Sequence, residues 1–238
     1  MNKNQIYQAL RKDIQALDTD KRYQRSSQRF FKKKVKIYGF TTPRARQLAA
    51  KYLPLVKKLE KNEVWDLAEK LLRHGYQQDH CIAFAWIAGW RKKYTESDWQ
   101  IFFHWLDKYA NNWGSVDDFS THALGYFLID YPAYLSEMKK WAKNRNPWVR
   151  RAAAVSLVFP LRRQVKCLDL VWEVADRLMG DEEDLVQKGY GWMLKVASEY
   201  YPKPVFDYVQ KNKRKMTRTA LRYAIEKMPV DWRRQALS

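Results

Sequence analysis

Apolar residues along this chain recur every three or four positions, which is the spacing of one face of an amphipathic α-helix. The first run places Ile6, Leu10, Ile14 and Leu17 at steps of four, four and three residues. No segment alternates apolar and polar residues as a half-buried strand does. The pattern therefore predicts an all-α protein, with helices within residues 5–17, 26–40, 41–53, 63–74, 79–94, 96–110, 115–129, 133–144, 147–159, 165–179, 183–200, 204–212 and 217–228.

Two of the predicted helices resemble each other in sequence. The segment WVRRAAAVSL, which begins at Trp148, aligns with LVQKGYGWML, which begins at Leu185, and Arg151 then stands opposite Lys188 at an offset of 37 residues. Helix pairs repeated every 35–45 residues or so are typical of α-solenoids of the HEAT or armadillo type. We therefore expect a single HEAT-like repeat domain over residues 1–238, curved and with a basic concave groove. A generic helical bundle is the alternative.

The charge of the chain indicates an anionic partner. Its 238 residues include 45 Lys and Arg against 26 Asp and Glu, for a formal net charge of +19. An excess of this size indicates phosphate binding, and nucleic acid is favoured because the cations are clustered. The alternative is that they complement helix dipoles at helix ends, and residues 139–143 are the weakest candidates for a nucleic-acid contact. The clusters lie in residues 29–36, 91–93, 139–143, 150–151, 162–163 and 213–215.

The rest of the composition argues against a disulfide-bonded, metal-binding, secreted or membrane-spanning protein. Cys81 and Cys167 each lie in an apolar run, so we expect buried thiols in a reducing compartment rather than a disulfide. Four scattered His and no CxxC motif argue against a metal site. The charged N-terminal segment lacks the apolar core of a signal peptide, and no apolar run is long enough to span a membrane. The expectation is a cytoplasmic protein that uses no metal or cofactor.

The stretch NNWGSVDDFS, residues 111–120, raises the question of why two carboxylates stand in so basic a chain. Ser115 is a good N-cap residue, and its spacing to Asp118 is that of a capping box. On this interpretation the helix begins after Ser115, Trp113 lies outside it, and Asp117 is its second residue. Asp117 is then either one more carboxylate that complements the dipole or a group required near positive charge.

Three segments in order carry a resemblance to a known family: Trp113-Gly-Ser-Val-Asp117, Trp148-Val-Arg-Arg151-Ala-Ala and Gln187-Lys-Gly-Tyr-Gly-Trp192. Together with GFTTPRARQ from Gly39 onward, they resemble the DNA alkylation repair glycosylases of the AlkD type. The resemblance covers most of the chain. It implies a HEAT-like fold and the excision of cationic bases, such as 3-methyladenine and 7-methylguanine, from duplex DNA.

The resemblance also implies roles for individual residues. Trp113 and Trp192 would form an aromatic cleft around the deoxyribose, Asp117 would stabilise the cationic sugar and orient water, and Arg151 would hold a phosphate. An alkylated purine already carries positive charge and leaves without being protonated, so no general acid is required, and no His stands out as one. The residues expected to contact DNA are Arg29, Phe30, Lys32, Lys33, Thr41, Thr42, Arg46, Arg150 and Lys188.

One position departs from the family. Counting back from Gly39, Phe30 stands where the family has a Tyr that approaches the damaged pair. Phe keeps the aromatic face and loses the hydroxyl group, so a non-catalytic HEAT-like protein that binds damaged or branched DNA is the second hypothesis. A scaffold for an acidic protein partner is the third. The leading expectation remains a monomeric DNA glycosylase acting on alkylated duplex DNA.

Overall fold

The apolar stripes of the sequence become the buried faces of helices. The computed structural model describes residues 1–238, and its first helix, α1 (Lys3–Leu17), buries Ile6, Leu10 and Ile14 as the spacing predicted. A capping box starts this helix, because the Asn2 side chain accepts from the Gln5 amide and the Gln5 side chain accepts from the Asn2 amide. The all-α helical fold predicted from the sequence is confirmed, and the pairing between Lys36 and Tyr76 is only an isolated bridge.

The chain forms two compact units, Met1–Ala123 and Leu124–Ser238. The single repeat domain and its curved groove stay predictions. The first unit contains α1, α2 (Lys21–Gln28), α3 (Thr42–Val56), α4 (Lys61–His74), α5 (Gln77–Gly89), the 3-10 turn η1 (Arg91–Lys93), α6 (Asp98–Tyr109) and α7 (Trp113–Thr121).

The second unit begins within α8 (Ala123–Asp130). It continues through η2 (Pro132–Glu137), α9 (Met138–Trp141), α10 (Pro147–Val155), α11 (Val158–Arg162), α12 (Leu168–Leu178), α13 (Asp184–Tyr200), α14 (Pro202–Asn212), α15 (Arg218–Ala224) and α16 (Val230–Leu237). The last of these helices was not predicted from the sequence. In the whole chain no helix is both long and apolar enough to cross a bilayer.

Helix α5 forms the centre of the first unit. It packs against α3, α4 and α7, and its apolar residues are buried on all sides, including Cys81, Phe84 and Trp86. A helix that is apolar all round is the expected sequence of a core helix. The two cysteines of the chain, Cys81 and Cys167, are both buried and free, as predicted. Burial raises the pKa of the Cys81 thiol to about 12.

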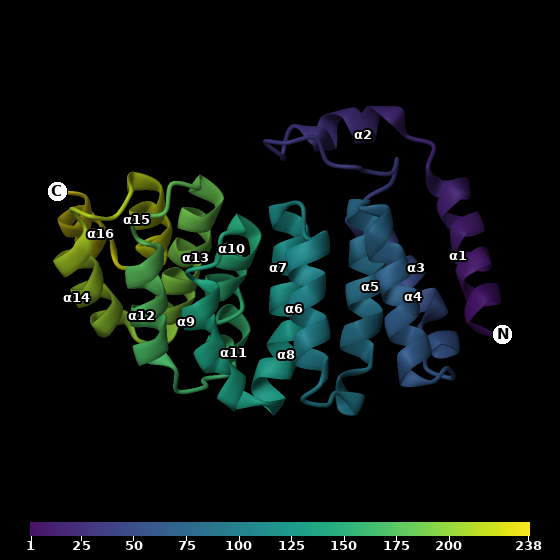
Figure 1. The fold of residues 1–238 in the computed structure, drawn as a ribbon. Coiled ribbons are helices and arrows are strands. Elements are labelled where there is room, and N and C mark those ends of the chain that lie inside the picture. The colour runs from purple at the N-terminus through teal and green to yellow at the C-terminus, as the bar shows by residue number, and fades with distance from the viewer. The chain divides into compact units, whose positions relative to one another are not determined.

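Helix α2 is shorter than the sequence predicted. The basic segment 26–40 was expected to be helical until Gly39, but α2 ends at Gln28 and residues 29–39 are mostly irregular. The Gln28 side chain explains the ending, because it donates to the Lys33 carbonyl and accepts from the Val35 amide across the turn. Figure 1 shows α2 lying across the ends of the other helices of this unit.

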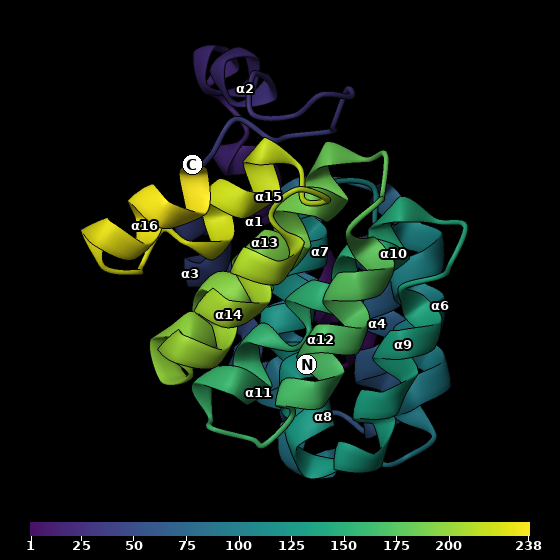
Figure 2. The ribbon, with the colours of Figure 1, turned by 90° about the vertical axis from the view of Figure 1, so that its left-hand side faces the viewer.

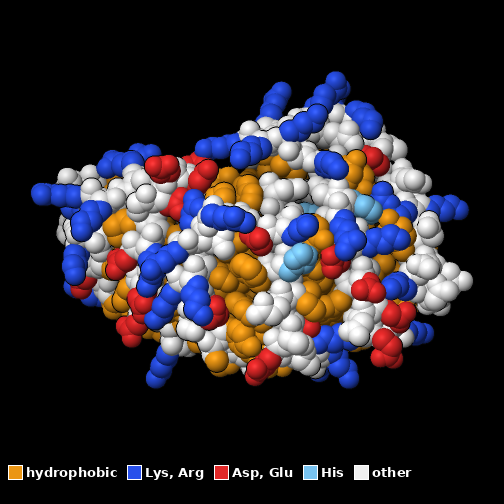
Figure 3. Space-filling view, viewed as in Figure 1, with side chains coloured by type: hydrophobic (Ala, Val, Ile, Leu, Met, Phe, Trp, Pro, Cys, Tyr) orange, Lys and Arg blue, Asp and Glu red, His pale blue; other side chains and the backbone are white.

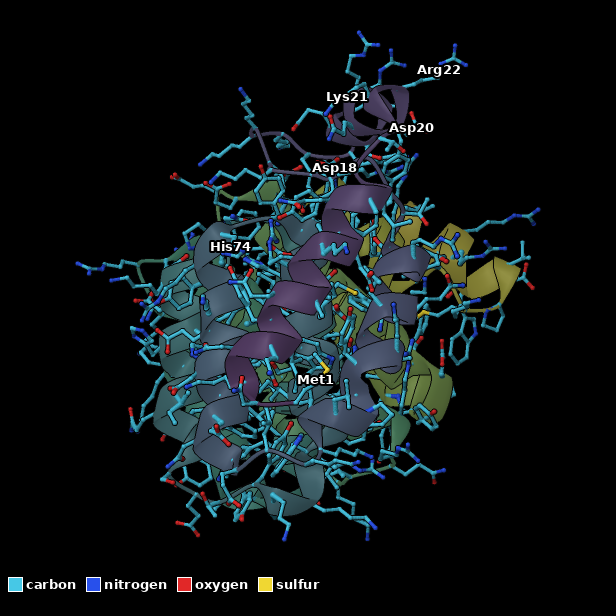
Figure 4. The ribbon with its side chains drawn as sticks, turned by 90° about the vertical axis from the view of Figure 1, so that its right-hand side faces the viewer. Met1, Asp18, Asp20, Lys21, Arg22 and His74 are labelled. Carbon is cyan, nitrogen blue, oxygen red and sulfur yellow. The ribbon has the colours of Figure 1, made fainter.

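Gly39 and Asp18 fasten the segment that follows α2. The Asp18 carboxylate accepts from the Gly39 amide at 2.5 Å, and a Cβ at Gly39 would lie 2.6 Å from the backbone nitrogen of Asp20. Figure 4 shows Asp18 and Asp20 at the junction between α1 and α2, with Lys21 and Arg22 projecting outward. Only glycine allows this approach of two backbone segments, so the position of the irregular segment depends on it.

Helix α13 is the centre of the second unit. It packs against α10, α11, α12, α14 and α15, and Figure 2 shows it among these helices. The closest approach is to α15, where a Cβ at Gly191 would lie 2.9 Å from the Ala220 carbonyl oxygen and 2.8 Å from the Tyr223 Cβ. The two segments that resembled each other in sequence, in α10 and α13, thus lie against one another in this unit.

Candidate active site

Helix α7 begins two residues earlier than Ser115. Asn112 is the N-cap, and its side-chain oxygen accepts from the Ser115 amide at 3.0 Å. The predicted N-cap at Ser115 and its capping box with Asp118 are therefore wrong. Asn and Ser are nearly equal as N-caps, so the sequence offered no means of choosing between them. Asp117 becomes the fifth residue of the helix, where the helix dipole has largely fallen off.

Because α7 begins at Trp113, Trp113 and Asp117 lie in the same helix, four residues apart. Residues four apart on a helix share one face. Trp113, Asp117 and Thr121 therefore form a single row along α7, and all three line one hollow of about 440 Å³, here called the α7 hollow. The predicted association of Trp113 with Asp117 thus has a local structural basis.

The α7 hollow has an aromatic side and a charged side. Tyr23, Phe30 and Phe31, from α2 and the segment after it, form the aromatic side together with Trp113. Arg46 of α3, Asp117 and Asp118 of α7, and His122 just after α7 form the charged side. The hollow therefore combines carboxylates, cations and ring faces in one place.

Trp113 holds the segment after α2 against α7. Its indole Nε1 donates to the Phe30 carbonyl at 3.1 Å, and its ring stacks on Phe31 with 5.6 Å between centroids and 29° between planes. Phe30, which stands where the family has a Tyr, lines the hollow but is 74% exposed. The ring that contacts Trp113 is thus that of Phe31, which the sequence analysis did not select.

Asp118 does not cap the helix, and its carboxylate pairs instead with the side chains of Arg46 and His122. Arg46 Nη2 lies 2.8 Å from its carboxylate, and His122 Nδ1 lies 3.1 Å from the same oxygen. The hydrogen bond to Asp118 raises the pKa of His122. Arg46, predicted as a DNA contact, is therefore ion-paired within the protein, and its side chain is 46% exposed.

A buried polar layer lies under the hollow. Ser115 Oγ lies 2.8 Å from His80 Nδ1, and the other His80 nitrogen contacts the Leu72 carbonyl at 3.1 Å. Burial lowers the pKa of His80 to about 4, so the ring is neutral at physiological pH. Gln78 accepts from the Tyr38 amide and donates to the Phe40 carbonyl, which fastens the end of the basic segment to α5.

The other predicted DNA contacts of the first unit lie near the hollow. Arg29, Lys32 and Lys33 are exposed on the segment after α2, and Figure 3 shows Lys and Arg side chains projecting there. Thr41 is exposed at the N-cap of α3, and Thr42 lines the hollow itself. Arg29, Lys32 and Lys33 are sequence neighbours of Phe30 and Phe31, which line the hollow.

The predicted residues of the second unit lie on α10 and α13. Arg151 is 5% exposed, and its guanidinium donates to the Leu185 carbonyl beside Gly189. Trp192 is half-buried on α13. The catalytic roles assigned to Arg151 and Trp192 stay predictions.

Two predicted DNA contacts of this unit are ion-paired within the protein. Arg150 Nε lies 2.6 Å from the Asp181 carboxylate, and its Nη1 donates to the carbonyls of Asn144 and Arg145. Lys188 lies 3.4 Å from Asp184, one helical turn away. Both cations already have acidic partners within the protein, so the contacts of Arg150 and Lys188 with DNA also stay predictions.

The lining residues that sequence reasoning missed include Tyr23, Phe31 and His122. Tyr23 and Phe31 stand within an aromatic and basic segment that drew attention only to Phe30. His122 follows Asp118 by four residues, a spacing that allows a side-chain pair on a helix and could have identified it. Its place at the hollow depends on where α7 ends.

Comparison with known proteins supports the family resemblance and the all-α fold. A sequence profile described as DNA alkylation repair enzyme matches residues 10–228. Among proteins with curated descriptions, none matches the chain.

Two solved structures share the fold. One is titled as a predicted DNA alkylation repair enzyme from Enterococcus faecalis, with 17% identity, 90% of this chain and 98% of that chain covered, and a TM-score of 0.79. The other is smu.31 from Streptococcus mutans UA159, with 18% identity, coverage of 79% and 98%, and a TM-score of 0.56. Because the profile spans nearly the whole chain, the protein belongs to the DNA alkylation repair enzyme family.

Proposed function

We propose that the protein is a DNA glycosylase that releases cationic N3- and N7-alkylated purines from duplex DNA. Membership of the family supports a role in the repair of alkylated DNA, with DNA as the partner. The observation that carries the finer proposal is the placement of Asp117 and Trp113 on one face of α7 within one hollow. A carboxylate beside an indole face in a basic protein suits a site for a transient cation.

The chemistry requires few groups. In an alkylated purine the glycosidic bond breaks with its electron pair moving to a base that already carries positive charge, so the base leaves neutral. The sugar left behind resembles an oxocarbenium ion. Asp117 would stabilise that charge, and the indole face of Trp113 would add a cation–π contribution. Water then adds to the anomeric carbon, and its proton passes to Asp117 or to solvent.

The size of the hollow and its aromatic side fit this role. A volume of about 440 Å³ falls within the range of small-ligand sites. Phe31, stacked on Trp113, fixes the indole in place, and the hydrogen bond from Trp113 to the Phe30 carbonyl prevents its rotation. A fixed ring is what stabilisation of a charge at a defined position requires.

Release of 7-methylguanine from methylated duplex DNA under single-turnover conditions tests the proposal. Losing one electrostatic stabiliser costs about 3 kcal/mol, so Asp117→Asn is expected to slow release by about 10²–10³. Asp66→Asn on α4 makes the same charge change on a carboxylate that is 68% exposed and outside the hollow. It is expected to retain the wild-type rate. Equal release by wild type and Asp117→Asn, both at background, would rule the proposal out.

A second candidate is a family member that binds damaged or branched DNA without excision. The observation that favours it is that Phe30 and Phe31, on the segment over the hollow, both lack a hydroxyl group. This candidate predicts tight and salt-dependent duplex binding with no base release. Excision by wild type that Asp117→Asn abolishes would exclude it.

A further inference from the structure

His122 occupies a position in the α7 hollow that the proposed mechanism leaves unused. It stands between α7 and α8 with φ −119° and ψ −89°, and its side chain lines the hollow with Trp113 and Asp117. The side chain is 43% exposed. It can therefore contact a ligand bound in the hollow.

The hydrogen bonds of His122 decide which ring nitrogen is available. Nδ1 lies 2.9 Å from the Asp118 carbonyl oxygen, 3.1 Å from the Asp118 carboxylate and 3.3 Å from Thr121 Oγ1. The Thr121 hydroxyl donates its own hydrogen to the Asp117 carbonyl, so all three partners of Nδ1 are acceptors and Nδ1 carries a hydrogen. Nε2, on the opposite edge of the ring, is then the nitrogen that gains or loses a proton.

Charged neighbours on several helices set the charge of this ring. The Asp118 carboxylate, which is only 11% exposed, favours the protonated form, and Arg46 opposes it. The net effect is a raised pKa for His122, which favours the imidazolium, the form that a general acid requires. The titratable and charged groups that line the hollow with it are Asp117 and Asp118 of α7, Arg46 of α3 and Tyr23 of α2.

We propose that His122, oriented by Asp118, donates a proton from Nε2 to the leaving base, so that the α7 hollow also releases uncharged alkylated purines. The class includes etheno adducts, which carry no fixed positive charge. This proposal rests on the proposed glycosylase activity and adds a second substrate class to it. His122 is the catalytic residue in this step, and Asp118 is a positioning residue.

The step balances without a further reactant. The Nε2 proton moves to N7 of the purine as the bond between the anomeric carbon and the base breaks, and the electron pair of that bond stays with the base. The base leaves neutral and His122 is left as neutral imidazole. Water adds to the anomeric carbon, and the proton it releases restores the imidazolium directly or through solvent.

The test uses the full chain and two duplex oligonucleotides under single-turnover conditions. One carries a single 7-methylguanine and the other a single 1,N6-ethenoadenine. Wild type is expected to release both bases. Ethenoadenine release should fall by about tenfold per pH unit once the pH exceeds the pKa of His122, whereas 7-methylguanine release requires no acid and should lack this dependence.

Two variants separate catalysis from structure. His122→Asn keeps an amide donor for Asp118 and removes Nε2, so ethenoadenine release should fall by about 10²-fold or more, at least ten times the fall for 7-methylguanine. Asp118→Asn removes the group that raises the pKa of His122. It should move the midpoint of the ethenoadenine profile to lower pH, a change that a loss of folding would not produce.

Several results would overturn the inference. Release of 7-methylguanine by wild type without release of ethenoadenine would leave the proposed function standing and refute the role of His122. An equal fall for both bases in His122→Asn, accompanied by weaker DNA binding, would make His122 a phosphate contact instead. Release of neither base by wild type would refute both proposals.

Discussion

The first unit buries eight polar or charged side chains and the second buries three, although the two units are similar in length. In the first unit, Gln78, His80, Asn112 and Ser115 lie at the N-terminal ends of α5 and α7, under the α7 hollow. Their hydrogen bonds join α5 to α7 and to the segment after α2. In the second unit, which buries fewer polar groups, α13 approaches α15 closely at Gly191.

The difference separates two ways of holding helices together. Hydrogen bonds are directional, so a buried polar layer fixes the orientation of the residues above it, as a site requires. Apolar packing around a small residue fixes distance and excludes larger side chains. The first unit should therefore be destabilised by protonation of its buried polar groups, and the second by added side-chain volume.

The largest expected effect is on the packing of the second unit. Gly191→Ala places a Cβ within 3 Å of the Ala220 carbonyl oxygen and the Tyr223 Cβ, and the backbone can move aside only by separating α13 from α15. Overpacking of this kind should lower the free energy of unfolding by about 3 kcal/mol, measured by urea denaturation. Gly180→Ala is the control, because nothing lies within 4 Å of its added Cβ. Similar losses in both variants would show that α13 and α15 are not in the close contact described.

The next effect is on the polar layer of the first unit. Burial lowers the pKa of His80 to about 4, whereas an unfolded histidine takes up its proton near its ordinary value. As the pH falls from about 6.5 toward 4, the unfolded state binds the additional proton, so stability should fall by about 2–3 kcal/mol. The contribution is fully present above this window.

The measurement for His80 is the free energy of unfolding as a function of pH in wild type and His80→Gln. The substitution removes the titrating group, so its stability should change less steeply across the window, even if it is less stable at every pH. Parallel curves for the two proteins would mean that His80 does not remain neutral in the folded state.

The smallest expected effect concerns the exposed cations of the first unit. Lys33 and Lys34 lie on the irregular segment after α2, beside the α7 hollow, and each should neutralise one DNA phosphate. Replacing both with Ala should reduce the slope of log Kd against log salt concentration by roughly two. Lys139→Ala with Lys140→Ala is the matched pair, because those lysines are ion-paired with Glu173 and Glu137. An equal change in slope for the two pairs would contradict a specific role for this segment.

Much of the helical fold follows from local sequence. The steps of three and four residues in α1 predicted its buried face correctly at Ile6, Leu10 and Ile14. The errors lie at helix ends. The segments 115–129 and 147–159 were each predicted as one helix, but each divides, the first at His122 and the second near Ser156. Apolar residues continue through both breaks, so periodicity alone does not mark them.

The candidate site was predictable only in part. Trp113 and Asp117 are four residues apart, so their association follows from helix geometry once the helix includes both. The choice of Asn112 over Ser115 as N-cap was not decidable locally, since Ser115 is instead hydrogen-bonded to His80 of α5. Ser115 thus contacts another helix instead of making the capping interaction that the local pattern predicted.

The sequence by itself determined that this protein is helical, basic and built around small and aromatic apolar residues, because those properties depend on spacing and composition. Only the tertiary structure decided that Arg46 reaches Asp118, 72 residues away, and that Phe31 rather than Phe30 stacks on Trp113. Contacts of this kind depend on how helices that are distant in sequence pack against one another. Packing of the whole unit sets those positions, and no local pattern of residues encodes them.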